Sequence, residues 1–169
     1  MNKKILAAAL LTITTSSVFA ANETFQATVN ALSDSSIANT TGLHFGAMQP
    51  TAGSVCTMDD AGAVTGDCDA SNGNIAIGLV TVSGLTANTP LDVTVSGSAG
   101  ANVTFASIID IDNATGTHDA VTDATVTAIV TNGSADDLAI NVYGSMTVDT
   151  VLTPGDTYTA DYIVDVSFQ

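Results

Sequence analysis

The chain has 169 residues, a formal net charge of −15 at pH 7, and two residues of the lysine and arginine type, Lys3 and Lys4. A protein surface with this excess of negative charge repels nucleic acid and anionic membranes, because phosphate binding depends on Lys and Arg. With 17 acidic residues and almost no cationic partner, we expect apolar packing and backbone hydrogen bonds, rather than salt bridges, to hold the fold. This balance favours an extracellular structural protein over an enzyme.

Residues 1–20 have the three parts of a secretory signal peptide. Lys3 and Lys4 form the positive region, an apolar run follows, and Val18 and Ala20 are the small residues before the cleavage site. The run is too short for a stable membrane anchor. We therefore predict export through the periplasm to the extracellular space or cell surface, with a mature chain beginning at Ala21 and no stable membrane insertion.

Residues 21–33 are predicted to form an N-terminal strand. Its apolar side chains alternate with polar ones and share one face: Phe25, Ala27, Val29 and Ala31. Such a strand either opens the sheet of its own domain or is donated to another chain. Residues 34–169 are predicted to form one β-sandwich domain, and Leu43 and Phe45 share a face near its start.

Two cysteines, Cys56 and Cys68, fit an oxidising compartment. The turn-forming stretch from Asp59 to Gly62 lets the chain double back between them, so we predict a disulfide across a hairpin. In the chain-entropy model so short a loop contributes about 3 kcal/mol. Free thiols or a zinc site are less favoured alternatives, since no histidine lies close by in the sequence.

Short alternating runs continue along the rest of the chain, separated by turns rich in Gly, Pro, Asn and Asp. A β-branched run, residues 75–82, reads as a buried strand. The expected inward residues are Leu91, Val93, Val95, Val103, Phe105, Val126, Ala128, Val130, Leu138, Ile140 and Val142. About eight or nine strands at this spacing predict an all-β, immunoglobulin-like β-sandwich, with a small closed β-barrel as the alternative.

Residues 108–123 are expected to form a long exposed loop, with at most a turn of helix around His118 to Asp123. Asp110, Asp112 and Asn113 present oxygen donors there and are weak calcium candidates. They lack the glycine and the closing glutamate of an EF-hand. A second acidic group lies beside the predicted disulfide: Asp59, Asp60, Asp67 and Asp69. No other cofactor is expected, and a solvated acidic loop is the alternative in both places.

Catalysis is not expected. The two histidines, His44 and His118, are not close in the sequence to a nucleophile in a recognised motif, and no phosphate-binding loop precedes a helix. Five Asn-x-Ser/Thr sequons begin at Asn22, Asn39, Asn102, Asn113 and Asn132, as expected by chance in so Asn- and Thr-rich a chain.

The C-terminal run alternates to its end, with an aromatic residue next to last and Gly155 upstream. Its same-face residues include Tyr158, Tyr162, Val164, Val166 and Phe168. This ending resembles the last strand of the archaic, spore-coat-like branch of chaperone–usher pilins. The motif Leu43-His44-Phe45-Gly46 resembles one near the start of that branch. The mature chain also resembles a related family of secreted bacterial β-domains of unknown function.

The resemblance implies a structural subunit of a bacterial extracellular fibre or matrix, assembled by donor-strand exchange. A periplasmic chaperone would first fill an incomplete sandwich and pair with the C-terminal strand. An outer-membrane usher would then exchange it for the N-terminal strand of the next copy. One alternative is a self-contained monomeric surface or ligand-binding domain, and another is a secreted hydrolase that depends on His44 or His118.

Overall fold

The computed structural model describes residues 35–71, 74–133 and 137–169. Two compact units are distinguished, residues 1–31 and 32–169, and every described residue belongs to the second. The predicted signal peptide and the predicted N-terminal strand, with Phe25, Ala27, Val29 and Ala31, therefore lie outside the described residues. The described residues form strands and connecting turns, with no helix among them.

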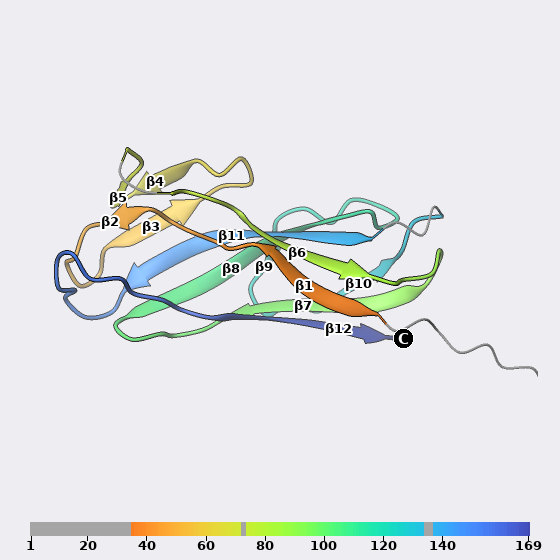
Figure 1. Cartoon of the computed structure of the whole chain (residues 1–169). Helices are drawn as coiled ribbons and strands as arrows, with labels where there is room; N and C mark the ends of the chain where they lie inside the picture. The colour runs from red at the N-terminus through yellow and green to blue at the C-terminus, as the bar shows by residue number, and fades with distance from the viewer. Residues whose placement is uncertain (1–34, 72–73, 134–136) are drawn as a thin grey trace, which may run out of the picture. The chain divides into compact units, whose positions relative to one another are not determined.

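The described residues form twelve strands, which are labelled in Figure 1. In chain order they are β1 (Ser36–Thr41), β2 (Ala47–Met48), β3 (Val55–Met58), β4 (Val64–Gly66), β5 (Cys68–Asp69), β6 (Gly78–Ser83), β7 (Pro90–Gly97), β8 (Val103–Asp112), β9 (Val121–Thr122), β10 (Thr127–Val130), β11 (Leu138–Val148) and β12 (Tyr162–Phe168). The structure has more strands than the eight or nine expected, because three of the strands span only two residues each.

The strands form two principal sheets, all of whose pairs are antiparallel. In the seven-stranded sheet, β11 is central: β8 pairs along one of its edges, and β6 and then β3 share the other. In the three-stranded sheet, β7 lies between β10 and β12. The two-stranded pair of β2 and β5 stands apart. The predicted β-sandwich is confirmed, and the closed-barrel alternative is wrong, because the pairing leaves both principal sheets open at their edges.

Alternating apolar residues of the two sheets form the core between them. Leu91, Val93 and Val95 face inward from β7, and Leu138, Ile140 and Val142 face inward from β11; all six are almost completely buried. The ring of Phe105 contacts the rings of Phe45 and Tyr162 edge-on, at centroid distances of 5.8 and 6.1 Å. These inward positions agree with the sequence prediction because less buried residues separate them along each strand.

Strand β10 turns its other face inward. Ile129 is 3% exposed, whereas Val126 and Val130 are 64% and 38% exposed. The prediction that Val126, Ala128 and Val130 face the core was therefore wrong. The register decides this orientation, since Ile129 lies opposite the buried Leu91 of β7.

The predicted loop over residues 108–123 was also wrong at its start. Strand β8 continues to Asp112 and pairs along ten residues of β11, with Ile109 and Ile111 buried. No helical turn forms near His118, where the chain instead makes the short strand β9. The acidic residues misled the prediction, because they lie on the outer face of a strand whose inner face is apolar.

Gly144 allows β11 to pair with two different strands, β6 and β3, along the same edge. Its φ is +131°, and a Cβ there would collide with the carbonyl oxygen of Ala106. At this point β11 passes from pairing with β6, at Val142, to pairing with β3, at Gly144 itself. A side chain would both strain the backbone and push β8 away.

Candidate functional site: an open seam between two edge strands

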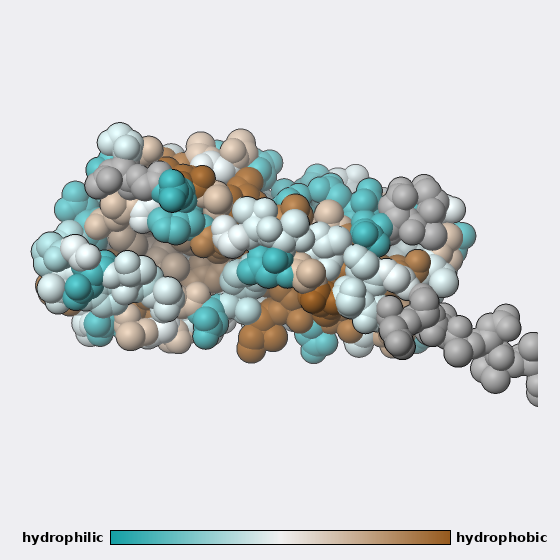
Figure 2. Space-filling view, in the orientation of Figure 1, coloured by the Kyte–Doolittle hydropathy of each residue, from teal (hydrophilic) through white to brown (hydrophobic). Residues whose placement is uncertain are grey.

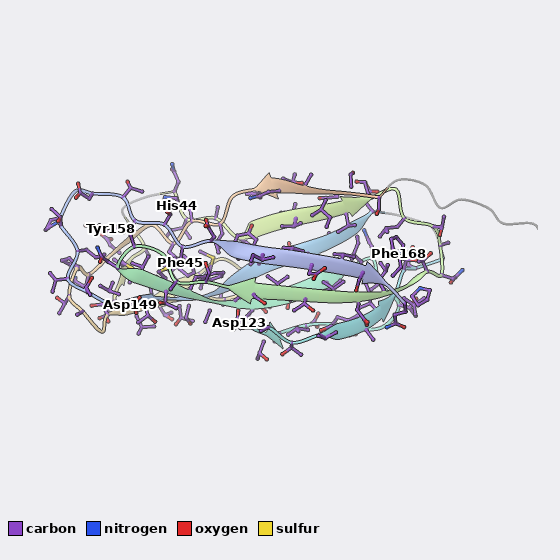
Figure 3. All side chains as sticks on the ribbon, turned by 90° about the horizontal axis from the view of Figure 1, so that it is seen from below. His44, Phe45, Asp123, Asp149, Tyr158 and Phe168 are labelled. Carbon is purple, nitrogen blue, oxygen red and sulfur yellow. A yellow bond between two sulfur atoms is a disulfide. The ribbon has the colours of Figure 1, made fainter. Side chains whose placement is uncertain are left out.

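Strands β1 and β12 are edge strands of different sheets. Each pairs with one neighbour in the described part of the chain, β1 with β6 and β12 with β7. Figures 1 and 3 both show them along the same side of the sandwich. We call the opening between them the seam.

Within the described residues, the edge of strand β12 that faces this seam has no partner strand. The amide of Gln169 bonds to Pro90 O, 3.3 Å away, and Asp161 O accepts a bond from the Ser98 hydroxyl. Backbone groups alternate between the two edges of an antiparallel strand. The N–H and C=O groups of Tyr162, Val164, Val166 and Phe168 therefore point away from β7.

A groove runs along the seam in two parts that share Ala160 and Tyr162. The small compartment, of about 330 Å³, is lined by Ile37, Asn39, Val80, Ala160, Asp161, Tyr162 and Val164. The large compartment, of about 550 Å³, lies between residues 43–50 and residues 152–162 and is floored by Phe45, Met48, Val103, Phe105 and Met146.

The large compartment is visible as a hollow between the segment that carries β2 and the loop before β12, with apolar residues in it (Figure 2). Phe45 and Tyr158 lie at this end, and Phe168 lies at the far end of β12 (Figure 3). Ile37, on the wall of the small compartment, is 49% exposed. The seam thus has two strand edges, those of β1 and β12, that lack a partner strand in the described part of the chain. Its large compartment has an apolar floor that is only partly covered.

The predicted C-terminal assembly residues divide into two groups. Tyr162, Val164 and Val166 are half-buried on the inner face of β12, and Phe168 is exposed at its end. Gly155 and Tyr158 precede the strand, in a loop where the Thr153 amide donates to the Tyr158 hydroxyl at 2.9 Å. The strand starts later than predicted, at Tyr162, and before it the chain passes close to Gly100, where a Cβ would collide with the Thr159 carbonyl.

Tyr162 carries a buried hydroxyl at the junction of the two compartments. This oxygen has no hydrogen-bond partner in the described part of the chain, and burial raises the pKa of Tyr162. An unsatisfied buried hydroxyl costs about 1–3 kcal/mol. We therefore expect Tyr162→Phe to leave the free energy of unfolding unchanged or to raise it by about 1 kcal/mol.

Urea unfolding at pH 7 measures this effect, with Tyr143→Phe as the matched control. The Tyr143 hydroxyl donates to Asp110 Oδ1 at 2.8 Å, so its removal should cost about 1–2 kcal/mol. A loss of more than about 1 kcal/mol in Tyr162→Phe would show that its hydroxyl has a stabilising partner.

The first calcium candidates are engaged in hydrogen bonds. Asp110 Oδ1 accepts from Tyr143 and from the Ala120 amide, and Asp112 Oδ2 accepts from Asn141 at 2.9 Å. The Asn113 amide nitrogen donates to a backbone carbonyl. Over residues 35–71, 74–133 and 137–169, no group of three or more His, Cys, Asp or Glu side chains is placed to hold a metal ion.

The contact between Tyr143 and Asp110 predicts sensitivity to alkali. Burial, together with the hydrogen bond to Asp110, raises the pKa of Tyr143 well above its usual value of 10. The unfolded chain therefore ionises first, and stability that is complete below pH 10 is lost as the pH rises above it. Between pH 9 and 11.5 we expect a falling urea midpoint, with a shallower fall in Tyr143→Phe. An equal slope in both proteins would contradict this assignment.

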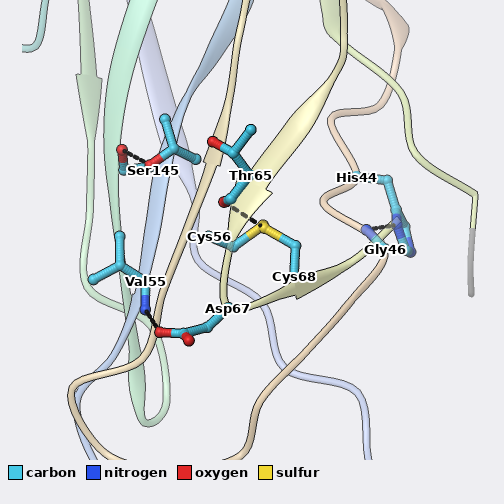
Figure 4. The surroundings of a disulfide bond; sticks show 9 residues. His44, Gly46, Val55, Cys56, Thr65, Asp67, Cys68 and Ser145 are labelled. Carbon is cyan, nitrogen blue, oxygen red and sulfur yellow. Dashed lines mark hydrogen bonds between the residues drawn. A yellow bond between two sulfur atoms is a disulfide. The ribbon is translucent and has the colours of Figure 1, made fainter. Parts of the chain in front are cut away.

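The second acidic group surrounds the predicted disulfide, which is confirmed (Figure 4). The carboxylates of this group accept hydrogen bonds from nearby backbone amides. Asp59 Oδ1 accepts hydrogen bonds from the amides of Ala61 and Ala63, and Asp67 Oδ2 accepts one from the amide of Val55. Asp69 accepts from both the hydroxyl and the amide of Ser71, which lower the pKa of Asp69.

Both histidines support local turns. His44 Nδ1 accepts from the Gly46 amide at 2.9 Å (Figure 4), and His118 Nε2 lies 3.1 Å from Thr115 O. His44 is exposed, as the alternation with Leu43 and Phe45 predicts.

Two features of the site escaped the sequence prediction. Strand β1 carries a polar sequence whose six residues are all exposed, so it has no alternating signal. Asp123 was placed in a loop, yet its Oδ1 joins β7 to β8 by accepting from Gly97 N and from the amide and hydroxyl of Ser107. The only sequence signal for this role of Asp123 is its position in a turn-forming stretch, where Asp side chains often accept hydrogen bonds from the backbone.

Comparison with protein-family models, with curated proteins and with solved structures found no match to this chain. In the described part of the chain, no helix is long and apolar enough to cross a membrane.

Proposed function

We propose that the protein is a non-catalytic, pilin-like structural subunit of a bacterial extracellular fibre, assembled by donor-strand exchange. The observation that supports this proposal is the seam groove, whose small compartment lies between the edge strands β1 and β12 and whose large compartment continues it over an apolar floor. Edge strands invite pairing with another chain, and an added strand gains both backbone hydrogen bonds and side-chain pockets.

A strand inserted between β1 and β12 would satisfy backbone groups of both edges. It would also cover Ile37 and complete the burial of Val164 and Val166. Covering large apolar side chains contributes about 1.5–3 kcal/mol for each one fully buried. The gain from pairing would therefore be distributed along the whole groove.

The proposed partners are copies of this chain, with a periplasmic chaperone that occupies the groove first and an outer-membrane usher that directs export. The described residues contain fourteen aspartates and no Lys or Arg, a charge balance that fits neither a nucleic acid nor an anionic membrane as partner.

A self-contained monomeric surface domain is the second candidate. One observation favours it: Leu91, Leu138, Ile140 and Val142 are completely buried in the core between the two principal sheets. A domain with this core could fold alone and bind its partners as a monomer.

Surface material from the native cell distinguishes the two candidates. Negative-stain electron microscopy should reveal fibres, and a detergent gel run without heating should give a ladder of subunit multiples that heating collapses. A single band of monomer size and no filaments would contradict the fibre proposal and favour the monomeric domain.

A further inference from the structure

The two compartments of the seam groove have different walls. The small compartment lies between the edge strands β1 and β12. The large compartment lies between residues 43–50, which follow β1, and residues 152–162, most of which precede β12. Because β1 ends at Thr41 and β12 begins at Tyr162, these two strands do not run along the large compartment. Its walls are therefore those of a pocket, and not of a channel between two strand edges.

Hydrogen bonds hold the walls of the large compartment in place. The Leu152 amide donates to Pro50 O at 2.9 Å, which joins one wall to the other. The Thr153 amide donates to the Tyr158 hydroxyl, also at 2.9 Å, which closes the loop on the second wall. The hollow is thus formed by the domain itself (Figure 2). Its volume of about 550 Å³ lies within the range of about 300–1,000 Å³ that is typical of small-molecule sites.

The lining of this compartment is apolar at the floor and acidic at the rim. The floor consists of aromatic, branched and thioether side chains, namely Phe45, Met48, Val103, Phe105 and Met146. Methionine side chains adapt to ligands of different shape, because they are unbranched and polarisable. Asp156 is exposed and is the one carboxylate among the described residues that line the compartment. No Lys or Arg in the described part of the chain could hold an anion there.

We propose that the large compartment binds a small organic ammonium cation. The apolar body of the ligand lies on the floor, and its ammonium group lies beside the Asp156 carboxylate. Complementary charge selects the cation over an anion of the same shape. A free small molecule fits better than a peptide, because a peptide strand adds to strand edges and neither β1 nor β12 runs along this compartment. The inference goes beyond the proposed function and does not depend on it.

Three probes that share a phenyl ring and a chain of four methylenes test the charge preference. Phenylbutylamine is positive at pH 7, phenylbutanol is neutral and phenylvalerate is negative. Each is titrated into the full chain, and the binding constant is measured by NMR. We expect the amine to bind about 2–5 times more tightly than the alcohol, since the carboxylate is exposed to solvent, and the carboxylate probe to bind more weakly than the alcohol.

The methionine methyl groups locate the site in the same titration. The methyl resonances of Met48 and Met146 should move as the amine binds, because both side chains line the large compartment. Met58 is the internal control: it is 1% exposed in the core and does not line the compartment, so its resonance should stay in place.

A matched pair of variants tests the carboxylate. Asp156→Asn should weaken binding of the amine by about 2–5-fold, to the level of the alcohol, and leave binding of the alcohol unchanged. Asp165→Asn removes the same charge from the outer face of β12, where the residue is exposed and lines neither compartment, and should change neither affinity.

Three results would overturn the inference. Equal affinities for the amine and the carboxylate probe would refute the preference for a cation. Movement of the Met58 resonance together with the others, or of none of them, would refute the site. Equal losses of amine binding in Asp156→Asn and Asp165→Asn would show that the net charge of the chain, and not Asp156, attracts the amine. None of these results bears on the fibre ladder, so the proposed function fails or stands separately.

Discussion

Replacing Cys56 and Cys68 together with alanine should lower the free energy of unfolding by about 3 kcal/mol. The disulfide joins β3 to β5 with a Cα–Cα distance of 5.1 Å, and it closes a loop of 12 residues' separation. Without it, the unfolded chain regains the freedom that the loop had removed. Cys56 is also completely buried in the core, so its shortening removes packing as well.

Urea unfolding with tryptophan-independent detection, such as circular dichroism, measures this change, since the chain has no tryptophan. The unaltered protein under strong reductant is the matched control and should lose a similar amount. A double variant within about 1 kcal/mol of the unaltered protein would mean that the hairpin is held by its strand pairing alone.

Asp123→Ala should cost about 2–4 kcal/mol, because it removes the acceptor of three hydrogen bonds that connect the two sheets. The distances to Asp123 Oδ1 are 2.7 Å from Gly97 N, 3.1 Å from Ser107 N and 2.6 Å from Ser107 Oγ. Ser107 is 2% exposed, so its buried hydroxyl would lose a short hydrogen bond to a charged group.

The effect of this variant should depend on pH. Burial raises the pKa of Asp123, but the hydrogen bonds from Gly97 and Ser107 outweigh it, and the net shift is downward. The stabilisation is therefore complete above the usual pKa of about 4 and is lost as the pH falls through the lower value of the folded state. Unfolding at pH 7 and at pH 2–3 should show a smaller difference between the two proteins in acid.

Asp119→Ala is the control, since this exposed residue lies just before β9, whereas Asp123 lies just after it, and its loss should change stability by less than about 0.5 kcal/mol. Equal changes in the free energy of unfolding for the two substitutions would indicate a general relief of charge repulsion, and not the loss of the specific hydrogen bonds that Asp123 accepts. A pH-independent loss in Asp123→Ala would contradict the role of its charge.

The sequence predicted strands well where one face is polar. In β7, Asp92, Thr94 and Ser96 alternate with buried residues, so period two is unambiguous. It predicted the disulfide for a similar reason, since a turn separates the two cysteines at hairpin spacing.

Errors arose where tertiary pairing overrides local pattern. Val126 and Val130 alternate like core residues, but the register with β7 buries Ile129 between them. Asp110 and Asp112 are typical of loops, yet β11 holds them in a strand. Such choices depend on which strand lies alongside, and a single alternating run does not contain that information.

The seam itself could be predicted only in part. The alternating C-terminal run indicated a strand, and β12 confirms one from Tyr162 onward. The opposite wall is formed by β1, whose polar sequence gives no sign of it. A groove between two edges is a property of sheet order, which local sequence does not determine.

The most direct test of strand addition at the seam compares two isoleucines that flank it. Ile37 lies on the groove wall and is 49% exposed, whereas Ile163 is 67% exposed and alternates to the outer face of β12. Both substitutions by aspartate should change monomer stability by no more than about 1 kcal/mol. In unheated detergent gels, we expect Ile37→Asp to lose the ladder of subunit multiples and Ile163→Asp to keep it. A full ladder in a folded Ile37→Asp protein would contradict assembly through the seam.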